Sequence, residues 1–197
     1  MDELILASRN EHKIQELRET LADLEIRLLS ALDISHLKEV EEDKLTLEGN
    51  AIKKARYVYE ETGLPALADD TGLEVDALDG RPGVFSARYA GKGATYQDNL
   101  EKLLDELAGV DPKDRKAQFR TVVALVSDEG THTFEGICRG AILKESQGDK
   151  GFGYDPVFRP DGYEQTFAEL EAEEKNRISH RGRAIRKLYS WLKESGH

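Results

Sequence analysis

Two adjacent aspartates follow a short apolar run in the stretch ALADDTGLEV, residues 66–75. The pattern predicts a strand over 66–70 that ends at Asp69 and Asp70. Adjacent like charges at a strand end cost free energy unless a cation, a helix N-terminus or water compensates them. Hard divalent cations such as Mg²⁺ take carboxylate oxygens together with waters and substrate phosphates. The pair is therefore a candidate metal site, with further acids at 41–43. The alternative is that one aspartate caps the next turn while the other is solvated.

The stretch LASRNEHK, residues 6–13, lies where an apolar run gives way to a helical pattern. Backbone N–H groups at a helix N-terminus bind anions, and Lys13 in the first turn adds a full positive charge. We therefore predict a phosphate-binding loop. The stretch lacks the G-x-x-x-x-G-K-[ST] pattern of a P-loop, so an ordinary strand-to-helix connection with a solvated lysine is the alternative.

The stretch GFGYDP, residues 151–156, combines glycines with aromatic side chains. Glycines on both sides of Phe152 let the backbone approach a ligand closely, while Phe152 and Tyr154 offer flat faces on which a nucleobase can stack. A purine pocket needs both features. The alternative is a glycine-rich turn with two core aromatics.

The stretch EKNRISHRGRA, residues 174–184, places basic side chains at the start of a helix. Ser179 is the predicted N-cap, so His180 and Arg181 occupy the first turn as donors for a base or a phosphate. Cations at a helix N-terminus oppose the helix dipole, which favours a ligand-binding role. A solvated basic face is the alternative.

Composition limits the partners that we expect. The 197-residue chain has a net charge of −11, which disfavours a nucleic-acid polymer or an anionic membrane surface. Residues 175–187 nevertheless carry six Lys or Arg and no acid, as expected for a site that binds a small anion. The single cysteine, Cys138, excludes an internal disulfide. The N-terminal residues have no basic region and only a short apolar run, so we predict a cytoplasmic protein without a signal peptide.

The spacing of apolar residues predicts an α/β fold. Strands are expected at 3–7, 26–32 and 66–70, and two β-rich runs within 117–143 should form a hairpin around the turn 128–130. Helices are expected after the loop SRNEH at 8–12, from Thr46 to Gly63, from Thr95 to about Ala108, and from Ser179. Residues 79–93 read as a structured loop. We predict one domain, 1–197, with a mixed twisted sheet and flanking helices.

Five stretches, LASRNEHK, ADDTG, GRPGVFSARYAG, GFGYDPVF and EKNRISHRGRA, together resemble the inosine triphosphate pyrophosphatase family, the XTP/dITP diphosphatases. The match runs from about residue 5 to residue 190 in consistent order. The resemblance implies an elongated fold of two lobes with a central cleft, and a homodimer. It also implies Mg²⁺-dependent hydrolysis of ITP, dITP and XTP to the monophosphate and pyrophosphate, which cleanses the nucleotide pool.

The resemblance also assigns roles to residues of this chain. Asp70 would be the catalytic proton acceptor and a metal ligand, and Glu42 would be the second metal ligand. The residues that would bind substrate are Ser8, Arg9, Asn10, Glu11, His12 and Lys13 at the triphosphate, Lys54 at phosphate, Thr71, and Phe152, Gly153, Tyr154, Asp155, Lys175, His180 and Arg181 around the base.

One motif departs from the family pattern. The family usually reads T-F-x-E-N-A where this chain has TLEGNA at 46–51, so the acid has moved back to Glu48 and Gly49 takes its place. Two other functions remain open. A Maf-like nucleotide pyrophosphatase also begins with LAS after a strand, but its usual LAS-x-S-P-x-R opening is absent here. The other is a non-catalytic nucleotide-binding module in which the acidic pair caps a turn.

Overall fold

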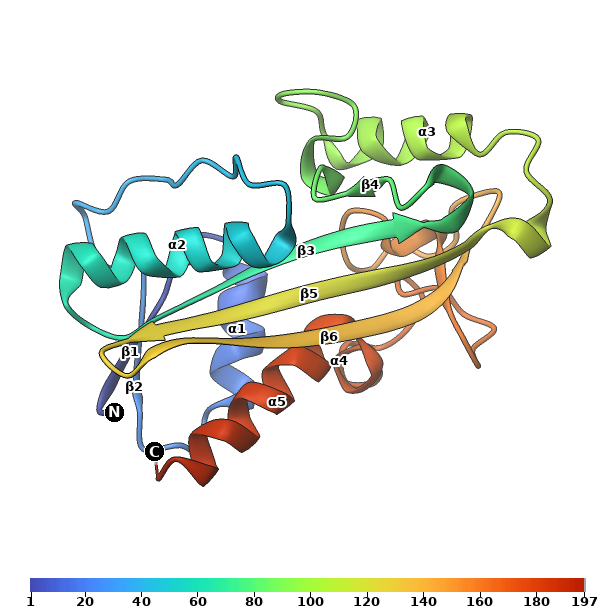
Figure 1. The fold of residues 1–197 in the computed structure, drawn as a ribbon. Helices are drawn as coiled ribbons and strands as arrows, with labels where there is room; N and C mark the ends of the chain where they lie inside the picture. Colours follow the sequence, from blue (N-terminus) through green and yellow to red (C-terminus); the bar gives the residue numbers. More distant parts are fainter. Residues whose placement is uncertain (197) are drawn as a thin grey trace. The chain divides into compact units, whose positions relative to one another are not determined.

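The structure is a computed structural model that describes residues 1–196, without the side chain of His12. The chain separates into two compact units. Unit A comprises Met1–Asp70, Thr121–Gly136 and the segment that starts at Arg181, and unit B comprises Thr71–Arg120 and Ile137–His180. The strands are hydrogen-bonded in the order β2-β1-β3-β5-β6-β7, with β4 paired to β3 (Figure 1). Three of these strands, β3, β5 and β6, contribute residues to both units.

Unit A has three parallel strands with helices on both faces, and residues 121–136 add part of a β-hairpin. Its elements are β1 (Glu3–Leu6), α1 (Glu11–Thr20), β2 (Arg27–Ser30), α2 (Leu47–Thr62), the first half of β3 (Ala66–Val75) and α5 (His180–Glu194). β1 pairs in parallel with both β2 and β3. Because side chains alternate along a strand, Leu4 and Leu6 pack with α1 and α5, whereas Ile5 packs with Val58 of α2. This alternation fixes which helices cover which face.

Side-chain caps mark the starts of two helices of unit A. The Asn10 side chain accepts a hydrogen bond from the N–H of Lys13 at the start of α1, and Thr46 does the same for Gly49 at the start of α2. α2 ends at Gly63, whose φ of 70° is a left-handed conformation that glycine adopts without strain. The predicted helix starting at Thr46 is therefore confirmed at both ends.

Unit B contains the remaining halves of the long strands and two helices. Its elements are α3 (Tyr96–Glu106), α4 (Ala172–Ile178), β4 (Pro82–Gly83), β7 (Phe158–Pro160), and parts of β3, β5 (Lys116–Ser127) and β6 (Gly130–Ile142). β4 is antiparallel to β3, and β7 is antiparallel to β6. Thr95 and Asp98 form a capping box at the start of α3, as the sequence predicts. Leu100 and Leu103 of α3 then enter the core of unit B.

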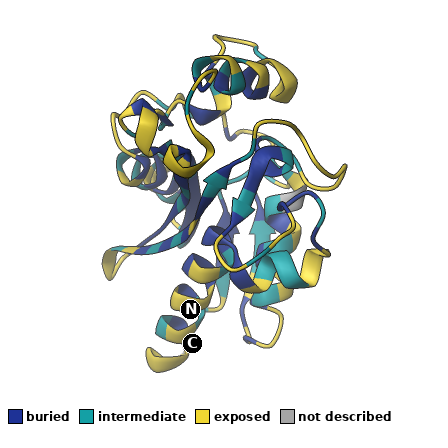
Figure 2. Cartoon of the chain, turned by 90° about the vertical axis from the view of Figure 1, so that its right-hand side faces the viewer, coloured by how far each residue is buried: buried dark blue, intermediate teal, exposed yellow. Residues whose placement is uncertain are grey.

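Burial follows the strands. Figure 2 shows buried residues concentrated along the strands and exposed residues on the outer faces of the helices and at loop tips. The predicted hairpin of β5 and β6 is present, and its turn at residues 128–131 is exposed. The predicted α/β class and the mixed sheet are confirmed.

One prediction about local structure is wrong, and one helix was not predicted. β3 runs for ten residues to Val75, so Asp69 and Asp70 lie inside the strand and not at its end. β3 also lies between β1 and β5 in the sheet. Leu73 and Val75 are fully buried and continue the strand beyond the charged pair. The sequence also gave no sign of α4, because only Ile178 in that polar helix is buried.

Candidate active site

Asp69 and Asp70 are consecutive residues of β3, but their side chains serve opposite faces of the sheet. Successive side chains of a strand point to opposite faces. Asp69 pairs with cations from α1 and α5, whereas Asp70 contacts two side chains of α2. The two carboxylates therefore have separate partners, which resolves the repulsion that their adjacency in sequence implies.

Asp69 is the centre of a buried network of charges. Its Oδ2 lies 2.9 Å from Lys13 Nζ and 3.4 Å from Arg181 Nε. Arg181 Nη1 also lies 3.0 Å from Glu16 Oε2. The side chains of Asp69 and Arg181 are 5% and 6% exposed. One carboxylate thus joins β3 to α1 and α5 in unit A.

The cations keep Asp69 ionised. Burial raises the pKa of Asp69, but Lys13 and Arg181 outweigh this effect and hold the pKa of that carboxyl well below its usual range. Burial lowers the pKa of Lys13, and Arg181 lowers it further, against the opposing attraction of Asp69. Asp69 is therefore an anion at neutral pH, and it holds the Lys13 ammonium in place.

On the other face, the ammonium of Lys54 lies among three oxygens. Its Nζ is 2.6 Å from Glu42 Oε1, 2.7 Å from the backbone oxygen of Asp69 and 3.8 Å from Asp70 Oδ1. The side chain of Lys54 is 16% exposed. The two acids that the resemblance assigns to metal, Glu42 and Asp70, are therefore linked through one lysine.

Burial and charge shift the pKa values in this group. Burial raises the pKa of Asp70, and the carboxylate of Glu42 adds to the shift, against Lys54 and Asn50. Burial lowers the pKa of Lys54, but Asp70, Asp69 and Glu42 outweigh it and raise that pKa overall. A carboxylate whose pKa is raised is a stronger base than an ordinary one, which suits a proton acceptor.

Asn50 is a site residue that the sequence reasoning missed. It is completely buried, and its Nδ2 donates to Asp70 Oδ2 over 3.0 Å. Its Oδ1 accepts from the N–H of Lys44 over 2.9 Å. Asn50 thus ties Asp70 to the connection that carries Glu42. The sequence signal that could have identified Asn50 is an amide side chain beside the apolar Ala51, on the face of the predicted helix that turns out to be buried.

The glycine that departs from the family pattern lies next to this connection. A Cβ on Gly49 would lie 3.0 Å from both Lys44 Cβ and Thr46 Oγ1. That separation is tighter than ordinary van der Waals contact. Glu48 is exposed in the first turn of α2.

The predicted phosphate loop already uses some of its own donors. Ser8 Oγ accepts from the N–H of Asn10 over 3.2 Å, and Asn10 Oδ1 accepts from the N–H of Lys13 over 3.3 Å. Arg9 Nη2 donates to the backbone oxygen of Leu37 over 2.6 Å. The N–H groups of Asn10 and Lys13 thus have partners within the loop itself. Glu11 is exposed, and the side chain of His12 lies outside the described part of the chain.

In unit B, Asp155 organises the glycine-rich loop. Its Oδ2 lies 2.6 Å from Lys175 Nζ and accepts the N–H of Phe152 over 2.8 Å. Lys175 Nζ lies 5.3 Å from the ring centroid of Phe152. Gly151 has a φ of 74°, and a Cβ there would lie 2.2 Å from Asp155 Oδ2, so this position requires glycine. Gly153 also has a positive φ, of 64°.

Tyr154 does not offer a stacking face, so that part of the prediction is wrong. Its ring is buried, and its hydroxyl donates to the backbone oxygen of Ser86 over 2.8 Å. Burial raises the pKa of this phenol. The side chain at residue 154 faces the core because the glycine on its N-terminal side turns the chain. Phe152 is half-buried and is the aromatic residue of the motif that is accessible.

His180 is packed among aromatic rings. Its imidazole lies against Phe119 with a centroid separation of 4.6 Å and near Phe167 at 6.2 Å, both in stacked orientations. Thr71, the first residue of unit B, is half-buried in β3. The predicted residues are thus brought together in two sets. Unit A holds Ser8 to Lys13, Glu42, Lys54, Asp70 and Arg181, and unit B holds Thr71, Phe152 to Asp155, Lys175 and His180.

Metal and membrane features are limited in the described residues. Over residues 1–196, no three His, Cys, Asp or Glu side chains are grouped as a metal site. Mg²⁺ that also binds phosphates commonly takes only one or two carboxylates from the protein. No described helix combines the length and apolar character needed to cross a bilayer.

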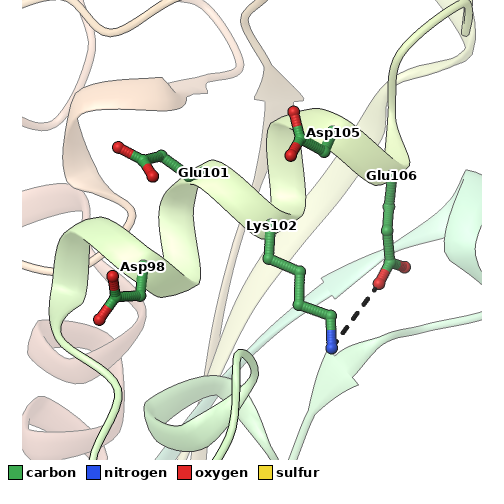
Figure 3. A pocket seen from close by; sticks show the side chains of 5 residues that line it. All are labelled: Asp98, Glu101, Lys102, Asp105 and Glu106. Carbon is green, nitrogen blue, oxygen red and sulfur yellow. Dashed lines mark ion pairs between the residues drawn. The ribbon is translucent and has the colours of Figure 1, made fainter.

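A pocket on α3 has the wrong charge for a triphosphate. Figure 3 shows its lining side chains, which all come from α3. They are Asp98, Glu101, Lys102, Asp105 and Glu106. Four carboxylates around one ammonium repel an anion, so this pocket is not the phosphate site.

Comparison with known proteins gives matches along nearly the whole chain. Residues 4–191 match the sequence model of the Ham1 family. A dITP/XTP pyrophosphatase of Flavobacterium psychrophilum is 49% identical over 191 residues, which cover 97% of this chain and 99% of the relative. The solved structure of a HAM1 protein from Coxiella burnetii has a TM-score of 0.93 at 45% identity, and covers 98% of this chain and 100% of that one. The structure of a nucleoside-triphosphatase / dITP/XTP pyrophosphatase from Mycobacterium abscessus has a TM-score of 0.80 at 42% identity, with coverage of 94% and 98%.

The network around Asp69 leads to a prediction about stability. Asp69→Asn removes the anion that two buried cations share, and we expect it to lower the free energy of unfolding by about 3 kcal/mol. Urea denaturation at neutral pH measures the change. Asp23→Asn is the matched control, because Asp23 is exposed and pairs with Lys193 in the same unit. Equal shifts in the two variants would contradict the central role of Asp69.

Proposed function

Since the chain belongs to the Ham1 family, we propose that it hydrolyses non-canonical purine nucleoside triphosphates to the monophosphate and pyrophosphate. dITP and XTP are the substrates that the names of its relatives carry, and ITP follows from the family resemblance. The family match confirms the resemblance that the five motifs indicate. The observation that carries the proposal is the grouping of two acids, Glu42 and Asp70, with Lys54 on one face of β3. We further propose that 1–197 act as one catalytic domain.

The acids of this group fit a divalent cation. The ammonium of Lys54 already lies between oxygens of Glu42 and Asp70, so a positive charge is stable there. Carboxylate oxygens are the ligands that Mg²⁺ prefers, and two carboxylates leave its other positions for water and phosphate. We therefore propose that Glu42 and Asp70 hold Mg²⁺. When bound, Mg²⁺ supplies positive charge that neutralises the triphosphate.

The chain's own residues supply the remaining chemistry. Asp70 accepts a proton from the water that attacks the α-phosphorus, and Asn50 holds its carboxylate in position. The new bond joins the water oxygen to the α-phosphorus, and the bond from that phosphorus to the bridging α–β oxygen breaks. Pyrophosphate leaves with the electron pair. Lys13 and Lys54 stabilise the charge that develops on it.

Base selection is assigned to unit B. Phe152 provides the face for a purine, and Asp155 with Lys175 fixes the loop that presents it. A keto oxygen at position 6 of the purine accepts hydrogen bonds, whereas the amino group of adenine donates them. Donors from the backbone N–H groups of this loop therefore favour the keto base, and adenine would leave buried donors unpaired.

The first prediction of the proposed function concerns the products of hydrolysis. The purified protein with Mg²⁺ should release pyrophosphate, and no orthophosphate, from ITP, dITP and XTP, and much less from ATP and GTP. Separate assays for the two phosphate products measure this. Nucleotide binding by calorimetry without any product would support a non-catalytic binding module instead. Release of orthophosphate would contradict cleavage at the α-phosphorus.

The second prediction concerns the proton acceptor. Asp70→Asn keeps the shape of the side chain and its contact with Asn50, but removes the base, so kcat should fall by about 10² to 10⁴. Circular dichroism should show an intact fold. Asp43→Asn is the control, since Asp43 is an exposed acid in the connection before α2 that pairs with Lys53 of that helix. A near-normal kcat in Asp70→Asn would exclude this role.

We also propose that the protein is a cytoplasmic homodimer, as the resemblance implies. Phe85 and Tyr96 of unit B are 49% and 54% exposed, and exposed aromatic side chains are enriched in protein interfaces. Light scattering at micromolar concentration should give the mass of two chains. A mass of one chain under these conditions would contradict the dimer.

A further inference from the structure

The ammonium of Lys54 lies between the two acids that are proposed to hold Mg²⁺. Its ammonium is 2.6 Å from Glu42 Oε1 and 3.8 Å from Asp70 Oδ1, with the backbone oxygen of Asp69 at 2.7 Å. These oxygens come from two places in the chain, the connection before α2 and strand β3, and one small cation joins them. Lys54 is therefore both a counter-ion of the two acids and a structural link between them.

The ammonium and a divalent cation compete for the same oxygens. Mg²⁺ binds carboxylate oxygens at about 2.0 to 2.1 Å and tolerates little distortion of its octahedron. A lysine ammonium at hydrogen-bond distance from the same carboxylate repels the metal ion strongly, because the site is partly buried. The carboxylate of Glu42 cannot bind both cations at full strength. Binding of one cation therefore weakens the binding of the other.

We propose that Lys54 is an exchangeable internal counter-ion of the metal site. In the metal-free protein its ammonium neutralises Glu42 and Asp70, and it leaves them for a substrate phosphate when metal and nucleotide bind together. This inference rests on the proposed function for the identity of the metal ligands. The inference goes beyond the proposed function because it couples the binding of metal to the binding of nucleotide. The ammonium that the metal releases gains a new anionic partner only when phosphate is present.

The adjacent lysine provides a matched control. Lys53 lies on the same helix, donates to the backbone oxygen of Glu41 over 2.7 Å and pairs with Asp43 at 2.8 Å. Lys53→Met and Lys54→Met each remove one positive charge from the same turn of α2. Only Lys54 contacts the two acids assigned to the metal. The difference between the variants therefore separates direct competition from a general change in charge.

The first experiment measures binding of Mn²⁺ alone, without nucleotide, by calorimetry. If Lys54 competes with metal, Lys54→Met should bind Mn²⁺ at least tenfold more tightly than the wild type, while Lys53→Met stays within threefold. Equal or weaker affinity in Lys54→Met, or no binding to any of the three proteins, would overturn the proposal. Pyrophosphate release by the wild type is measured separately, so failure of the proposed function is distinguished from failure of the exchange.

The second experiment uses the wild type and stays informative if Lys54→Met does not fold. Amine-labelling with mass-spectrometric readout should give several-fold more modification of Lys54 when Mg²⁺ is added at saturating concentration, with little change at Lys53. Addition of a non-hydrolysable nucleotide should then protect Lys54. Unchanged or lower labelling of Lys54 with Mg²⁺ would show that the ammonium stays in place, and would overturn the proposal.

Discussion

The shared anion at Asp69 is the interaction on which the candidate site of unit A depends. Its buried carboxylate neutralises Lys13 from α1 and Arg181 from α5, so two helices that are far apart in sequence are held to one strand. Breaking a buried ion pair by removing one partner leaves an uncompensated charge, which is far more costly than the loss of a surface pair. The orientation of Lys13 is therefore set by the fold itself.

On the opposite face of the same strand, the carboxylate of Asp70 contacts one neutral side chain and one positive side chain. Asp70 receives a hydrogen bond from Asn50 and lies near Lys54, and both come from α2. This arrangement leaves Asp70 with a raised pKa, while its neighbour Asp69 keeps a lowered one. Two identical side chains, one residue apart, thus acquire different acid–base character because the strand turns them toward different helices.

Helix ends were predicted well from the sequence because the residues that mark them lie within a few positions of one another. Thr46, Gly63 and Thr95 mark helix ends through contacts within a few residues, and the structure has those ends. The end of β3 was placed too early, because an isolated acidic pair looks like a strand end. Only the distant cations, Lys13 and Arg181, explain why the strand continues. Asn50 and the orientation of Tyr154 were missed for the same reason, since both depend on partners that lie 20 or more residues away.

Two of the four boundaries between the units fall inside motifs. They lie between Asp70 and Thr71 and between His180 and Arg181, and the other two lie after Arg120 and after Gly136. Neither unit is a continuous stretch of sequence, so no single genetic crossover transfers either one intact to another protein. Point substitutions within a common frame are therefore a simpler route to a new substrate preference in this fold than the exchange of a whole unit.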